Sequence, residues 1–144
     1  MTRRRFHIAL GILLASCLTS AGDRETFVVI VNKSNRFDVL SRARVEYLFL
    51  RKVSRWPWGA EVFPIDLDTP GTARRDFTSQ VLHTTGRELA NYWIDQRMTR
   101  GVVPPGRVAS VAGVKALVAA TPGAIAYIPP AACDRTVKIL RVEQ

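Results

Sequence analysis

Continuous apolar runs separated by turn residues indicate where the strands of this chain lie. The clearest run is residues 26–32 (TFVVIVN), and its unbroken apolar character is typical of a strand that is covered on both faces. Residues 62–66 and 124–128 have the same character, and residues 136–142 form a last candidate strand. The pattern therefore predicts a sheet whose central strands are buried.

Apolar residues at helical spacing predict four helices between these strands. They span approximately residues 41–50, 71–82, 85–98 and 111–120. Ser41 and Ser110 are suited to cap the first and the last helix, and Thr85 with Glu88 fits a capping box for the third. Residues 100–107 (RGVVPPGR) contain two prolines and two glycines, so we expect a loop there.

The predicted order of elements is strand, helix, strand, three helices and two strands. Strands that alternate with helices indicate an α/β fold, a mixed sheet flanked by helices on its faces. The chain has 144 residues, of which 47% are hydrophobic and 23% are charged. This length and composition predict one globular domain, which we place at residues 23–144.

The first 22 residues are typical of a signal peptide. Three consecutive arginines, Arg3 to Arg5, precede an apolar run at residues 8–14 that is too short to span a bilayer. Residues 2–6 (TRRRF) also resemble a twin-arginine export signal. We therefore expect export to the periplasm or to the outer face of the cell envelope.

Two cleavage sites are compatible with this signal. Residues 14–17 (LASC) resemble a bacterial lipobox, in which Cys17 would become the lipidated N-terminus and the only link to a membrane. The alternative is ordinary cleavage after Ala21 or Gly22. The sequence leaves both open.

The positive charge favours anionic partners. Residues 1–22 hold three arginines and no acidic residue, so their removal would lower the formal charge from +9 to +6. In an exported protein this indicates anionic solutes, lipid head groups or cell-wall polymers. The basic residues between positions 42 and 55 lie next to Trp56 and Trp58, but no nucleic-acid-binding motif accompanies them. We therefore interpret them as a solvated face and expect no nucleic-acid partner.

Residues suited to catalysis or to metal binding are sparse. Cys133 is the only cysteine after the signal, so no disulfide and no zinc site are expected. Asp66, Asp68 and His83 show no triad order or metal-binding spacing. We expect no enzyme activity, no catalytic residue and no cofactor; a hydrolase is the weakest of the functions considered.

The turn between the strand at 62–66 and the helix at 71–82 is the candidate anion site. A helix N-terminus offers free backbone N–H groups and the positive end of the helix dipole. The residues expected to contact an anion are Asp68, Thr69, Gly71, Thr72, Arg74 and Arg75. The alternative is an ordinary turn with both arginines on a solvated face.

Three segments in the right order resemble the PstS-like family of phosphate-binding periplasmic proteins, the type II solute-binding proteins. Residues 45–56 (VEYLFLRKVSRW) are similar to the family's IFLGK…RW segment. Residues 113–128 (GVKALVAATPGAIAYI) are similar to its GV.ALV..TPGAIGY segment. The central turn falls at the family's RSDGSGT phosphate loop. The resemblance implies a single lobe, corresponding to the second of the family's two, a phosphate or related oxyanion ligand, and an ABC permease partner.

The phosphate loop departs from the family pattern at two positions. Pro70 stands at the family's serine position, and Asp66 stands at its arginine position, while Asp68 is retained. Proline removes a hydroxyl and an N–H donor, and an aspartate repels an anion. Arg74 or Arg75 could replace the lost positive charge. The expected function is therefore an exported solute-binding domain of ABC-type phosphate uptake with a degenerate anion loop.

The alternative function is an envelope protein–protein interaction module that uses the same lobe without transporting a ligand. The family binds its ligand between two lobes, so a single lobe would expose the surface that the other lobe covers, and exposed patches usually serve partners. Trp56 and Trp58 are candidate contact residues for such a partner; the alternative, which the sequence favours, is that they are core or turn aromatics.

Overall fold

The computed structural model describes residues 24–144. The predicted signal peptide and the predicted lipidation of Cys17 lie outside these residues. The strands are β1 (Val28–Val31), β2 (Val39–Ser41), β3 (Phe63–Leu67), β4 (Gly106–Val108), β5 (Ala124–Ile128) and β6 (Lys138–Glu143). The helices are α1 (Arg42–Phe49), α2 (Thr72–Gln80), α3 (Gly86–Arg100), α4 (Val111–Ala120) and the short 3₁₀ helix η1 (Pro130–Ala132).

The six strands form one mixed sheet in the order β2-β6-β1-β5-β3-β4. Strand β1 runs antiparallel to both of its neighbours, β5 and β6. The other three pairs, β2 with β6, β3 with β5 and β3 with β4, are parallel. The carboxyl ends of the adjacent strands β3, β4 and β5 therefore meet at one edge of the sheet.

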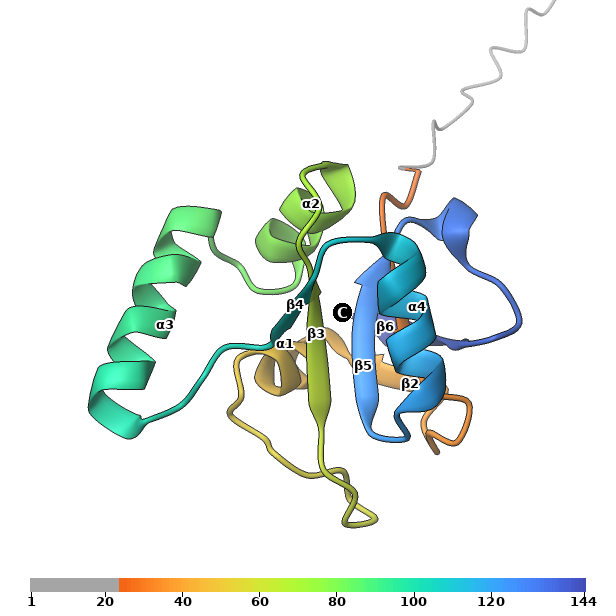
Figure 1. Ribbon diagram of the computed structural model, residues 1–144, viewed down its shortest axis with the longest axis horizontal. Helices are drawn as coiled ribbons and strands as arrows, with labels where there is room; N and C mark the ends of the chain where they lie inside the picture. The colour runs from red at the N-terminus through yellow and green to blue at the C-terminus, as the bar shows by residue number, and fades with distance from the viewer. Residues whose placement is uncertain (1–23) are drawn as a thin grey trace, which may run out of the picture.

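Helices cover both faces of the sheet (Figure 1). On one face, Phe77 of α2 stacks on Tyr127 of β5 with ring centroids 4.0 Å apart, and it packs edge-on against Phe49 of α1 at 4.6 Å. On the other face, α4 contributes the buried residues Val114 and Val118. All five residues of β5 are buried, as expected for a central strand between two helical layers.

The turn before β5 depends on a close approach of two backbones. A Cβ atom at Gly123 would lie 1.8 Å from the carbonyl oxygen of Glu61, so no larger residue fits there. The carbonyl of Gly123 accepts a hydrogen bond of 3.0 Å from Nε1 of Trp56. Trp56 is 3% exposed, so it is a core aromatic, the interpretation that the sequence favoured over a contact residue. Trp58 is half-buried and stacks on it at 5.2 Å.

Helix α3 stands apart at one side of the molecule (Figure 1). It has 15 residues, and none of them is buried. The predicted capping box is present, since the Thr85 side chain accepts from the backbone of Glu88 and the Glu88 side chain accepts from the backbone of Thr85. Gly101 ends the helix in the left-handed conformation, with φ 66°.

The predicted α/β fold with a mixed, helix-flanked sheet is confirmed, and so are the four helices. Two predictions were wrong in detail. Residues 106 and 107, which were expected to end a loop, belong to strand β4, and strand β2 was not predicted. Both have three residues, too few to show an alternating pattern, and both are stabilised by hydrogen bonds to a distant strand.

Candidate anion-binding site

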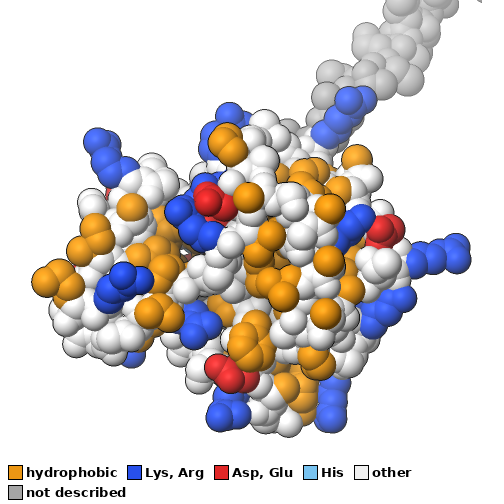
Figure 2. All heavy atoms as spheres, in the orientation of Figure 1, with side chains coloured by type: hydrophobic (Ala, Val, Ile, Leu, Met, Phe, Trp, Pro, Cys, Tyr) orange, Lys and Arg blue, Asp and Glu red, His pale blue; other side chains and the backbone are white. Residues whose placement is uncertain are grey.

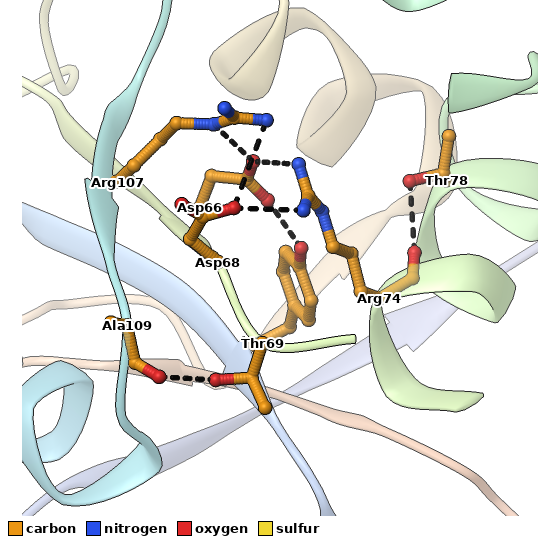
Figure 3. Close-up of polar contacts among 8 residues, drawn as sticks. Asp66, Asp68, Thr69, Arg74, Thr78, Arg107 and Ala109 are labelled. Atoms are coloured by element: carbon orange, nitrogen blue, oxygen red, sulfur yellow. Dashed lines mark hydrogen bonds and ion pairs between the residues drawn. The ribbon is translucent and has the colours of Figure 1, made fainter. Parts of the chain in front are cut away.

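Four charged residues and one tyrosine meet where strands β3, β4 and β5 end. Asp66 and Asp68 come from β3 and the turn after it, Arg107 from β4 and Tyr127 from β5. Arg74 lies in the first turn of α2 and faces the same point (Figure 3). Open α/β sheets bind ligands at the carboxyl ends of their strands, so this edge is where the fold would place a ligand.

The two arginines bridge the two aspartates (Figure 3). Nη1 of Arg74 lies 2.9 Å from Oδ1 of Asp68, and its Nη2 lies 3.2 Å from Oδ2 of Asp66. Arg107 is held more loosely, with Nε 3.7 Å from Oδ2 of Asp66 and Nη2 3.9 Å from Oδ1 of Asp68. Two guanidinium groups thus face two carboxylates, and the charges of this network cancel.

Exposure distinguishes the two arginines. The side chain of Arg74 is 28% exposed, whereas that of Arg107 is 58% exposed. An anion arriving from solvent therefore meets Arg107 first, and it can displace Arg107 from the aspartates at a lower cost than Arg74.

Tyr127 fixes the orientation of Asp66. Its hydroxyl donates a hydrogen bond to Oδ1 of Asp66. Burial, followed by the charge of Asp66, raises the pKa of Tyr127 well above its ordinary value. The hydroxyl therefore stays protonated and keeps donating, which leaves Oδ2 of Asp66 for the arginines.

The residues predicted for anion binding do not all meet. Asp68 and Arg74 pair with each other, whereas Arg75 is 72% exposed and pairs with Asp76 at 3.0 Å. The hydroxyl of Thr69 donates to the backbone carbonyl of Ala109, so the threonine joins the turn to the segment after β4.

Gly71 and Thr72 stand at the N-terminus of α2. Gly71 is the N-cap residue, and no side chain caps the helix there. The first backbone N–H groups of the helix therefore have no capping side chain as a partner. This leaves them as proposed ligand contacts.

Arg107 and Tyr127 were missed in the sequence. Arg107 lies in the segment expected to be a loop, yet it is the direct cross-strand partner of Asp66 in the parallel β3–β4 pair. If residues 106–108 had been predicted as a strand beside β3, the pairing of Arg107 with Asp66 could have been expected. Tyr127 was treated only as a buried strand residue, and no sequence signal indicated its partner.

A cavity of about 670 Å³ adjoins the charged network and lies between α2 and α3. Asp66, Arg74 and Arg107 line one end of it. Figure 2 shows the hollow between the projecting helix and the body of the molecule, with basic and acidic side chains at its rim. The volume lies within the range of about 300–1,000 Å³ that is usual for small-molecule sites.

Within residues 24–144, no group of three or more histidine, cysteine or acidic side chains is placed to hold a metal ion. No helix in that part of the chain is long and apolar enough to cross a bilayer.

No family model matches the sequence, and a search of curated proteins gives no match. Solved structures do match the fold. An ABC-type phosphate transport receptor from Vibrio cholerae aligns with a TM-score of 0.62 and 18% identity, over 83% of this chain and 46% of the receptor. PstS from Borrelia burgdorferi aligns with a TM-score of 0.62 and 14% identity, over 83% of this chain and 47% of PstS. A putative phosphate ABC transporter substrate-binding protein from Clostridium perfringens, with bound phosphate, aligns with a TM-score of 0.62 and 18% identity, over 81% of this chain and 44% of that protein.

The chain spans less than half the length of each of these proteins. At this level of identity the match shows the fold and leaves the ligand open. The fold matches one lobe of PstS-like periplasmic binding proteins, which agrees with the fold that the resemblance implied.

Proposed function

We propose that this protein is an exported solute-binding domain that binds an oxyanion weakly at the N-terminus of α2. The observation that carries the proposal is the placement of Arg74 and Arg107 beside that helix end, at the carboxyl ends of β3 and β4. A helix N-terminus and guanidinium groups are both suited to an oxyanion. Two of the proteins that are similar in fold are a phosphate transport receptor and a putative phosphate transporter protein with bound phosphate, which supports phosphate as the first ligand to test.

The charge balance explains why binding should be weak. An anion must displace at least one arginine from Asp66 or Asp68, and Asp66 itself repels it. Hydrogen bonds from charged groups contribute about 1.5–3 kcal/mol each. Most of the free energy that an anion gains from such bonds is offset by the ion pairs that it breaks. We therefore expect a dissociation constant on the order of 1 mM for phosphate at low salt.

Calorimetric titration with phosphate at low salt tests the proposal. Asp66→Asn keeps the shape of the side chain and removes its charge, so it should bind phosphate about tenfold more tightly. Arg107→Gln should bind at least about tenfold more weakly than the wild type. Arg135→Gln makes the same change of charge at an exposed position outside the cavity lining and should leave binding unchanged.

Two results would count against this function. One is the absence of phosphate and sulfate binding by both the wild type and Asp66→Asn at millimolar concentration. The other is equal weakening by Arg107→Gln and Arg135→Gln, which would show that general charge and not this site attracts the anion.

A second candidate function is an envelope interaction module, in which an ABC permease or another envelope protein binds the projecting helix. It is favoured by the apolar side chains that α3 presents to solvent, since Ile94 is 59% and Met98 is 82% exposed. These residues are four positions apart and lie on one side of the helix. Met98→Asp should abolish capture of a partner from envelope extracts and leave phosphate binding unchanged. A partner that binds this variant as well as the wild type would exclude α3 as the contact surface.

A further inference from the structure

The cavity between α2 and α3 is much larger than a phosphate ion, and most of its wall is apolar. Its charged lining residues are Asp66, Arg74 and Arg107 of the network and Arg75, which follows Arg74 in α2. The apolar side chains of the wall are Phe49, Phe77, Leu82, Leu89, Ala90, Trp93, Pro104 and Pro105. A free phosphate ion has no apolar surface to place against them.

The hydroxyl groups in the wall already have partners within the protein. Thr78 donates to the carbonyl of Arg74 at 2.8 Å, and Ser79 donates to the carbonyl of Asp76 at 3.2 Å. Thr84 donates to Glu88 at 3.2 Å, and the hydroxyl of Thr85 accepts from the backbone N–H of Glu88 at 3.3 Å. Since these groups need no ligand to satisfy them, the wall away from the charged end favours an apolar occupant.

The cavity thus has one charged end and one apolar body, and its occupant should have the same division. We infer that the ligand of this site is an organic oxyanion, with an oxyanion head at Arg107 and the α2 N-terminus and an apolar body of at least aromatic-ring size between α2 and α3. This inference rests on the proposed oxyanion function and specifies the class of ligand. The body would bury apolar surface that inorganic phosphate lacks, and that burial is the source of its additional affinity.

Helix α3 is suited to be the outer wall of such a site. It has no buried residue, and Leu89 and Trp93 are packed only in part against the core. An element with so few buried contacts can shift without unfolding the sheet. The cavity can therefore adapt to bodies of different shape while the charged end stays fixed on β3 and β4.

Three probes separate the head from the body: phenyl phosphate, inorganic phosphate and benzyl alcohol, each titrated into the purified chain. Trp93 lines the cavity, so tryptophan fluorescence and calorimetry can both follow binding. Phenyl phosphate should bind at least about tenfold more tightly than inorganic phosphate, because its ring enters the apolar part. Benzyl alcohol, which has the ring without the charge, should bind more weakly than phenyl phosphate by at least about tenfold.

A variant that fills the cavity provides the second test. Ala90 lines the cavity from an exposed position on α3, so Ala90→Phe places a ring in the apolar part without removing a core contact. It should reduce the affinity for phenyl phosphate to that for inorganic phosphate and leave inorganic phosphate unchanged. Met98→Phe is the matched control, because it adds an aromatic ring to the same helix at a position outside the lining.

The outcomes distinguish this inference from the proposed function. Equal affinity for phenyl phosphate and inorganic phosphate would overturn the inference and leave the oxyanion function standing. Binding of benzyl alcohol as tight as that of phenyl phosphate would also overturn it, because the charged head would then contribute nothing. If no probe binds, both are overturned. Binding of phenyl phosphate alone, lost in Ala90→Phe and kept in Met98→Phe, supports the inference and restricts the function to organic oxyanions.

Discussion

Helices α2 and α3 both line the candidate site, but they are held in place differently. Helix α2 has nine residues, of which Ala73, Phe77 and Thr78 are buried. Helix α3 has 15 residues, and none is buried. The longer helix therefore contributes less to the core than the shorter one.

The two helices also differ in the source of their helical structure. Helix α3 has a complete capping box at its start and a left-handed glycine at its end, so local signals define it. Helix α2 has no side-chain cap, and its position depends on Phe77 and on the ion pairs of Arg74. Tertiary packing thus holds α2 and the charged end of the site in place. Helix α3, the outer wall of the site, can open at a lower free energy than the sheet.

Truncation of Phe77 should have the largest effect on stability. This ring is 1% exposed and lies against Tyr127 at 4.0 Å and Phe49 at 4.6 Å. Phe77→Ala should lower the free energy of unfolding by about 3–5 kcal/mol, as urea denaturation would measure. Met98→Ala on α3 should change it by less than about 0.5 kcal/mol. Similar losses in both variants would remove the distinction between the two helices.

The ion pairs of Arg74 should come next. Arg74→Met keeps the length of the side chain but leaves Asp66 and Asp68 with Arg107 alone. We expect a loss of about 1 kcal/mol, which allows for the exposure of these side chains to water. Arg75→Met is the neighbouring control, because Arg75 is 72% exposed and contacts only Asp76 among the acidic groups described. A loss in Arg75→Met as large as in Arg74→Met would show that the network at the sheet edge adds no stability of its own.

The sequence predicted those parts of the molecule whose signals are local or continuous. Strand β5 is a run of five apolar residues, and it is buried throughout. The capping box at Thr85 and the caps at Ser41 and Ser110 are present as predicted. Each of these signals lies within a few neighbouring residues, so no knowledge of the fold was needed to find it.

The candidate site was predicted only in part, because its partners are far apart in the sequence. Arg107 reaches Asp66 through the pairing of β3 with β4, and β4 is too short to show a strand pattern. Arg74 was expected to be available to an anion, yet it is paired with Asp66 and Asp68. The cavity wall depends on the angle at which α3 leaves the body, and no spacing in the sequence specifies that angle.

A smaller and local effect is expected at Tyr92, which ties α3 to the body. Its hydroxyl donates to the carbonyl of Leu50 at 3.0 Å. Tyr92→Phe removes that bond and should lower the free energy of opening of α3 by about 1 kcal/mol. Hydrogen exchange measured by NMR should show faster exchange in α3 and unchanged exchange in β5. Faster exchange in both would mean that α3 and the sheet unfold as one unit.

The smallest effect should be a pH dependence confined to the start of α3. The backbone N–H of Thr85, and then the hydroxyls of Thr85 and Thr84, lower the pKa of Glu88 below its ordinary value. A carboxylate with a lowered pKa in the folded state stabilises the fold above its unfolded pKa of about 4.3, and this contribution is lost as the pH falls through the folded pKa. Amide protection in the first turn of α3 should therefore decrease below about pH 4.3 in the wild type.

Glu88→Gln is the control, because it keeps an acceptor at this position without a titrating charge. Subtracting its pH profile of amide protection from that of the wild type removes the effect of all other carboxylates. If amide protection falls by the same amount in the wild type and in Glu88→Gln, the capping carboxylate does not control the opening of α3.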